Sequence, residues 1–233
     1  MDWQIVVLAS VVGYLCGSVS FARIVSRLVD PNVDIEGIDL DDRRVDAISG
    51  TAVSMKLGPR YGGLTAILDI LKVAVPTLIF RILYRPEPYF LFTAALGLVG
   101  HNWPLYYRFK GGRGLSAIMG GFLVVDWIGT LVTSIVGMAL GLLVVKNVLV
   151  SYLAGLWLMI PWVWFRTRQV SYVLYIVFAN VVFVAALIPE VRRGIEEQRQ
   201  GAASDLSHQM DATPMGKMIK KMGARVGLFE AED

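Results

Sequence analysis

Long apolar stretches divide this chain, and most of them are close to the length that a helix needs to cross a lipid bilayer. A membrane-spanning helix requires about 20 consecutive apolar residues. Hydrophobic residues make up 55% of the 233-residue chain and charged residues 18%, whereas soluble domains have about 45–50% and about 25%. The excess of apolar residues is concentrated in these stretches. We therefore predict an all-α integral membrane protein.

Seven apolar stretches can be distinguished, and the fourth is shorter than the others. They lie at Trp3–Phe21, Tyr61–Phe80, Tyr89–Tyr107, Leu115–Val125, 127–145, Val148–Phe165 and Val170–Ile188. Asp126 interrupts the apolar run between the fourth and fifth stretches, so a six-span alternative merges these two. Basic residues accumulate in cytoplasmic loops. Most of them share one side when the N-terminus is outside and the C-terminus is cytoplasmic, which requires an odd number of spans and favours about seven transmembrane helices.

The composition becomes polar after the last stretch, which divides the chain into a membrane domain at 1–190 and a cytoplasmic tail at 191–233. Basic and apolar residues alternate over 215–229. The apolar positions there have helical spacing, so this segment is either a basic amphipathic helix on the inner leaflet or a solvated tail. The tail could dock on membrane lipid or on a partner membrane protein.

A basic, glycine-rich loop lies between the third and fourth stretches and reads Lys110-Gly111-Gly112-Arg113-Gly114. Its three glycines allow backbone N–H groups to turn towards a ligand, and a helix follows directly. Helix N-termini and such N–H groups bind phosphate, and Lys110 and Arg113 add positive charge. The spacing differs from the GxxxxGK[ST] pattern of a P-loop. The loop is therefore either an anion site or a tight, positively charged turn on the cytoplasmic side.

Two charged residues, Asp69 and Lys72, lie inside the second apolar stretch. They are three residues apart, so they share one face of a helix. Each charge in a bilayer costs about 2.5–3.5 kcal/mol on insertion scales, so the pair should face the interior of the bundle or a wet cavity. Lys72 either forms an internal ion pair or reaches the anion site. His101, near the glycine loop, is a candidate acid–base group or phosphate donor.

The sequence argues against several other kinds of site. The single cysteine, Cys16, excludes an internal disulfide framework and a CxxC motif. Only two histidines are present and they are far apart in the chain, so we expect no metal site and no cofactor. No pattern typical of an RNA-binding module occurs, so nucleic acid is not an expected partner.

The acidic segment at 30–60 also holds Ser49 and Thr51, which are candidate phosphate contacts.

Four motifs occur in an order and spacing that are typical of one protein family. They lie at residues 17–21, 58–62, 68–72 and 100–114. The last is the most specific, because the family loop reads Gly-His-x-x-Pro-x-x-x-x-Phe-Lys-Gly-Gly-Lys-Gly and only Arg113 departs from it, in place of the final Lys. Together these motifs resemble the bacterial membrane glycerol-3-phosphate acyltransferases that use acyl phosphate, the PlsY type.

This resemblance implies a seven-helix protein of the bacterial plasma membrane with its active site near the inner face. It implies that residues 110–114 bind glycerol 3-phosphate, with Lys72 assisting, His101 orienting the loop, and Ser49 and Thr51 as polar groups of the first cytoplasmic loop. The expected reaction transfers an acyl chain from acyl phosphate to the 1-hydroxyl and gives lysophosphatidate. The departing phosphate can itself take the hydroxyl proton.

Two other family motifs are not matched in this chain. In the first cytoplasmic loop a gapless comparison keeps Thr51, whereas Met55 stands where the family has Arg. The family also carries a His and an Asn after its last helix, and residues 189–194 contain neither. The alternative to an acyltransferase is therefore a non-catalytic relative that binds a phosphate or lipid, or that serves as a structural subunit of a membrane complex.

Overall fold

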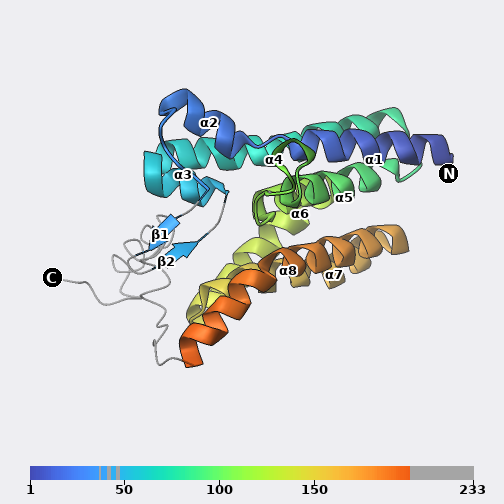
Figure 1. The fold of residues 1–233 in the computed structure, drawn as a ribbon. Helices are drawn as coiled ribbons and strands as arrows, with labels where there is room; N and C mark the ends of the chain where they lie inside the picture. Colours follow the sequence, from blue (N-terminus) through green and yellow to red (C-terminus); the bar gives the residue numbers. More distant parts are fainter. Residues whose placement is uncertain (37, 41–42, 46–47, 200–233) are drawn as a thin grey trace.

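The computed structural model describes residues 1–36, 38–40, 43–45 and 48–199. Helices form most of this part of the chain, and one short antiparallel hairpin is the only strand structure among the described residues. The predicted helical membrane fold is confirmed, with the hairpin as an addition. Figure 1 shows the N-terminus and the hairpin at opposite ends of the molecule, with α1, α4 and α5 side by side and α7 beside α8.

The elements follow one another with short connections and carry the labels of Figure 1, where η1 is a 3₁₀ turn and η2 a π-helical segment. In chain order they are α1 (Trp3–Ser18), α2 (Phe21–Val29), β1 (Ile38–Leu40), β2 (Arg43–Val45), α3 (Gly50–Leu57), α4 (Pro59–Leu83), α5 (Tyr89–Asn102), η1 (Leu105–Tyr107), α6 (Leu115–Ala139), η2 (Leu140–Val145), α7 (Val148–Thr167) and α8 (Val170–Arg199).

Three segments are long and apolar enough to cross a membrane by length and composition: Trp3–Val29, Leu115–Val145 and Val170–Ile188. The last helix does not end at Pro189, as the sequence suggested, but continues to Arg199. The count of seven spans, the orientation of the termini and the division at residue 190 stay predictions. The proposed amphipathic helix at 215–229 lies outside the described residues.

The first helix ends earlier than the apolar pattern predicts. α1 stops at Ser18, Val19 and Ser20 have extended backbones, and α2 begins at Phe21. The prediction of one uninterrupted span to Phe21 is therefore wrong at its end. The reason is a tertiary contact, because the Val19 carbonyl accepts a hydrogen bond from Lys72 Nζ at 2.6 Å rather than from a later N–H of its own helix.

Glycines allow α1 and α5 to pack backbone against backbone. Gly13 and Gly17 lie four residues apart on α1, and a Cβ at either position would overlap the carbonyl oxygen of Thr93 or Gly97 on α5. Small residues at this spacing commonly mediate close helix contacts in membranes. The contact brings the last turn of α1 next to the last turn of α5, where the candidate site lies.

The segment predicted as one long loop over residues 30–60 contains β1, β2 and α3 instead. β1 and β2 pair in antiparallel register, with Ile38 opposite Val45. Buried apolar side chains from this segment and from α2 form a second, smaller core: Ala22, Val25, Ile35, Ile48 and Val53. The single-loop prediction is wrong because these few apolar residues bury one another although acidic residues surround them in the sequence.

Asp126 interrupts α6, as the sequence predicts. Its backbone is extended, with φ −155° and ψ 98°, and its Oδ1 atom accepts a hydrogen bond from the Gly129 N–H at 3.1 Å. This is the arrangement of an N-cap, so a new helical run begins here. The run then lies antiparallel to α7, since Gly129 faces Trp162 and Gly137 faces Gly155.

Asp126→Ala should destabilise the protein because this carboxylate also binds α7. Its Oδ2 atom lies 2.7 Å from Arg166 Nε and accepts a hydrogen bond from Trp162 Nε1 at 3.0 Å. We expect the free energy of unfolding to fall by about 2–3 kcal/mol, as a cap and an interhelical hydrogen bond are lost together. Asp2→Ala is the matched control, because Asp2 caps α1 at an exposed site through the Gln4 N–H. Thermal unfolding in detergent should show a clearly smaller loss for the control, and equal losses would contradict the bridging role.

Candidate functional site

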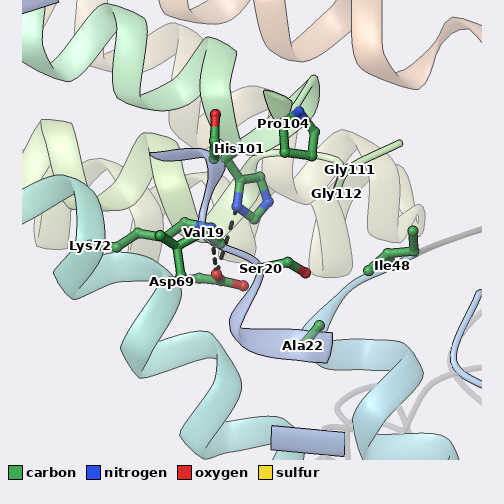
Figure 2. Close-up of a pocket in the computed structure, with 11 residues that line it drawn as sticks. Val19, Ser20, Ala22, Ile48, Asp69, Lys72, His101, Pro104, Gly111 and Gly112 are labelled. Atoms are coloured by element: carbon green, nitrogen blue, oxygen red, sulfur yellow. Dashed lines mark hydrogen bonds and ion pairs between the residues drawn. The ribbon is translucent and has the colours of Figure 1, made fainter. Parts of the chain in front are cut away.

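A small cleft lies where α1 gives way to α2, and α4, the end of α5 and the glycine loop complete its walls (Figure 2). Its polar side chains come from Ser18, Ser20, Asp69, Lys72 and His101. The extended backbone between α1 and α2 makes room for the cleft, since a continuous helix would place a further turn there. The cleft therefore depends on the early end of α1.

Lys72 and Asp69 form a buried ion pair in the cleft wall (Figure 2). The Lys72 Nζ atom lies 2.7 Å from Asp69 Oδ1, and the two side chains are 5% and 4% exposed. The same ammonium group donates to the Val19 carbonyl. An ammonium group has three N–H donors, so these two contacts among the described residues leave one donor for a ligand in the cleft.

His101 is buried beside this pair in the last turn of α5. Its Nδ1 atom lies 3.8 Å from Asp69 Oδ1, which is too long for a hydrogen bond. The Nε2 atom faces Gly112. The His101 carbonyl accepts a hydrogen bond from the Gly112 N–H at 3.1 Å. His101 is thus both a cleft residue and the point at which the glycine loop attaches to α5.

Close packing on α5 requires the glycines of the loop. A Cβ at Gly111 would overlap the His101 carbonyl oxygen, and a Cβ at Gly112 would overlap His101 Nε2. Gly114 has φ 93°, a left-handed conformation that favours glycine, and a Cβ there would lie 2.5 Å from Asn102 Oδ1. Glycine is therefore needed in the loop for close contact with α5 as well as for the left-handed turn at Gly114.

Two residues before the glycines also have left-handed backbones, Arg108 with φ 51° and Phe109 with φ 60°. Such conformations cost about 1–3 kcal/mol each in a non-glycine residue and persist where surrounding contacts hold them. Two backbone hydrogen bonds of 3.0 Å hold this turn, from the Phe109 N–H to the Pro104 carbonyl and from the Lys110 N–H to the Tyr107 carbonyl. The loop is therefore fixed from within as well as by α5.

Four of the residues predicted from the sequence line the cleft together: Lys72, His101, Gly111 and Gly112. Three other loop residues do not line it, although they flank the glycines that do. The Lys110 side chain is exposed, Arg113 is half-buried, and Gly114 is buried against Asn102. Their part in phosphate binding stays a prediction.

Ser49 is the N-cap of α3 and Thr51 lies in that helix, and neither residue lines the cleft. The Ser49 Oγ atom accepts a hydrogen bond from the Ala52 N–H at 3.3 Å, so this hydroxyl caps α3. Thr51 lies in the first turn of α3 and is half-buried. Ile48 is the cleft residue of this segment. The predicted contact of Ser49 and Thr51 with phosphate remains a prediction.

Sequence reasoning missed three residues at or near the cleft. Ser18 and Ser20 flank the break after α1, and the buried Ser18 Oγ accepts a hydrogen bond from the Leu105 N–H at 3.4 Å. Arg23 is a buried side chain of α2, although a basic residue after an apolar stretch is typical of a loop facing the cytoplasm. Within the described part of the chain, no group of three His, Cys, Asp or Glu side chains is placed to hold a metal ion.

The family of the protein follows from comparison with known sequences. A family model described as glycerol-3-phosphate acyltransferase matches residues 7–197. The chain belongs to this family. A glycerol-3-phosphate acyltransferase of Mycoplasma mycoides subsp. mycoides is 31% identical over 196 residues, which cover 73% of this chain and 73% of the relative. Glycerol-3-phosphate acyltransferase 1 of Oceanobacillus iheyensis is 28% identical over 156 residues, or 64% of this chain and 69% of the relative.

Solved structures of this family have the same fold. The crystal structure of PlsY (YgiH), an integral membrane glycerol 3-phosphate acyltransferase, in its glycerol 3-phosphate form matches with a TM-score of 0.70 at 21% identity, covering 86% of this chain and 94% of that chain. Its lysophosphatidic acid form matches with a TM-score of 0.68. The family membership, the shared fold and the apolar helices make this protein a multi-pass protein of the bacterial plasma membrane, as the sequence predicts.

Proposed function

We propose that this glycerol-3-phosphate acyltransferase family member transfers an acyl chain from an acyl phosphate to the 1-hydroxyl of glycerol 3-phosphate, and so makes lysophosphatidate for phospholipid synthesis. The observation that carries the proposal is the cleft in which the glycine loop meets Lys72 and His101. Relatives named for this activity support the acyltransferase over a purely structural role.

In this proposal the acceptor phosphate binds between Lys72 and the glycine loop. Lys72 offers a cationic N–H donor, and hydrogen bonds between charged partners are roughly twice as strong as neutral ones. Gly111 and Gly112 present backbone without side chains at the cleft, which allows an anion to approach closely. Lys110 and Arg113 on either side add a positive field that raises the local concentration of a dianion.

The cleft is narrow in this structure, with a cavity volume of about 10 Å³, which is room for about one water molecule. In this proposal the walls of the cleft move apart when a glycerol phosphate group binds. A long acyl chain has no room in the cleft, so we infer that it extends from the cleft into the lipid.

The proposed reaction requires no acylated side chain. The acceptor hydroxyl oxygen attacks the carbonyl carbon of the acyl phosphate, which forms the new ester C–O bond and breaks the C–O bond to phosphate. The departing phosphate takes the electron pair of that bond and the hydroxyl proton. In this proposal Lys72 and His101 hold the reacting groups, and orientation of two reactants can supply about 7–11 kcal/mol of barrier lowering.

Purified protein given palmitoyl phosphate and glycerol 3-phosphate is expected to form lysophosphatidate and inorganic phosphate in equal amounts. Palmitoyl-CoA is the control donor and should give no product, because the departing group is then not a phosphate. A family member of demonstrated activity is assayed alongside. If that enzyme works and this chain forms no product, the proposal fails. Binding of lysophosphatidate without turnover would then favour the non-catalytic relative.

A further inference from the structure

Arg23 is a buried arginine of α2 that takes no direct part in the proposed reaction. Its side chain is 7% exposed, although arginine is almost never fully buried unless it is paired. A buried guanidinium group must find partners for its N–H donors, because an unpaired buried charge is strongly unfavourable. The partners of Arg23 therefore indicate which segments it holds together.

These partners come from two segments that are far apart in the sequence. Arg23 Nη1 donates to the Lys110 carbonyl at 3.1 Å, and Nη2 donates to Glu36 Oε1 at 3.1 Å. The guanidinium carbon lies 4.3 Å from the centre of the Tyr107 ring, within the range of a cation–π interaction. One side chain thus contacts Lys110 of the glycine loop, Tyr107 of η1 just before it, and Glu36 in the segment after α2.

The contacts with Tyr107 and Lys110 lie on the two sides of the turn that leads into the cleft. Tyr107 directly precedes the left-handed residues Arg108 and Phe109, and Lys110 directly precedes Gly111, which lines the cleft. The side chains of Arg108 and Phe109 are exposed, so they add little packing to hold the turn. Arg23 therefore contacts the chain on both sides of this turn, at Tyr107 and at Lys110.

We propose that Arg23 is a positioning residue that fixes the glycine loop at the cleft and joins this loop, through Glu36, to the segment between α2 and β1. The proposal rests on the proposed function, because the affinity for glycerol 3-phosphate is what the loop position should set. Arginine suits this task because its planar fork can reach two acceptors while its face lies on an aromatic ring. A lysine at this position can keep one of these contacts but not all three.

The kinetic test compares Arg23→Gln, Arg23→Lys and Arg27→Ala. Arg27 is the matched control, because it is an exposed basic residue one turn later on α2. We expect Arg23→Gln to raise the KM for glycerol 3-phosphate roughly tenfold, the effect of losing hydrogen bonds to a charged group, with a much smaller change in kcat. Arg23→Lys should lie between Arg23→Gln and the unchanged protein. The KM for palmitoyl phosphate and the kinetics of Arg27→Ala should stay as they are.

Limited trypsin digestion gives a second readout that needs no activity. Arg108 and Lys110 are exposed cleavage sites in the loop, and Lys146, exposed at the turn before α7, is an internal reference. We expect Arg23→Gln to speed cleavage at the loop relative to Lys146, and Arg27→Ala to leave the ratio unchanged. The proposal would be overturned if Arg23→Gln left the ratio of loop cleavage to Lys146 cleavage unchanged. It would also be overturned if the variant were active and loop cleavage rose without a rise in the KM for glycerol 3-phosphate. If no protein turns over, the proposed function fails and the cleavage ratio alone decides whether Arg23 anchors the loop.

Discussion

Lys72→Met is expected to lower kcat/KM for glycerol 3-phosphate about 100-fold or more, as the loss of a charge-assisted hydrogen bond of about 3 kcal/mol implies. The substitution removes the cationic donor of the cleft. It also leaves the Asp69 carboxylate buried without its partner, where a negative charge opposes the binding of a phosphate. Breaking a buried ion pair in this way typically also costs about 3–5 kcal/mol of stability. Initial rates with palmitoyl phosphate, together with thermal unfolding in detergent, measure both effects.

The double variant Asp69→Asn/Lys72→Met separates the two roles that the sequence leaves open for Lys72. Removing both charges together should restore most of the lost stability, since a neutral, well-packed pair often replaces a buried ion pair without penalty. If Lys72 binds the acceptor, activity stays low in this stable protein. If activity returns with stability, the pair has only a packing role and the assignment of Lys72 to the phosphate site is wrong.

Much of the helical frame could be predicted from the sequence because it depends on local composition. The apolar stretches locate the helices, and Asp126 marks the break in α6 because a carboxylate in an apolar run also caps the next helix. The sequence predicts a site at Gly111, Gly112 and Gly114, and the contacts of these glycines with α5 explain why glycine is needed there. The family resemblance implies that Lys72 and His101 act with the loop, although spacing alone leaves Lys72 open between an ion pair and the anion site, and the structure brings both residues into one cleft.

The features that could not be predicted depend on contacts between distant segments. The apolar pattern continues through Val19, and the hydrogen bond that its carbonyl accepts where α1 stops comes from Lys72, 53 residues later. Arg23 and Lys110 are 87 residues apart, and nothing near Arg23 in the sequence indicates that it is buried. Ser49 has a hydroxyl suited to phosphate, yet its local position at the start of α3 makes it a cap. Residue type alone did not distinguish these roles.

Gly112→Ala is expected to lower kcat/KM about 100-fold, because a misplacement of about 1 Å in a reacting constellation can cost that much in rate. The new methyl group would overlap His101 Nε2, so either the imidazole or the loop must move. Gly63→Ala is the matched control, since Gly63 lies on α4 with open space around its Cβ position and alanine favours a helix. Rates and unfolding temperatures of both variants are measured together, and the control should lose neither activity nor stability.

A double-mutant cycle with His101→Ala tests whether the Gly112→Ala defect arises from this one contact. Residues in contact show non-additive effects, whereas independent residues add. With the imidazole gone, the closest remaining neighbour of the methyl group is the Ile48 carbonyl oxygen at 3.0 Å, so Gly112→Ala should have a much smaller further effect in the His101→Ala background. If the effects of the two substitutions on kcat/KM are fully additive, the loop acts on the substrate independently of His101. The role of Gly112 would then be only to let the phosphate approach the backbone. Non-additivity would make His101 and Gly112 one unit, in which the glycine permits the ring to hold its place in the cleft.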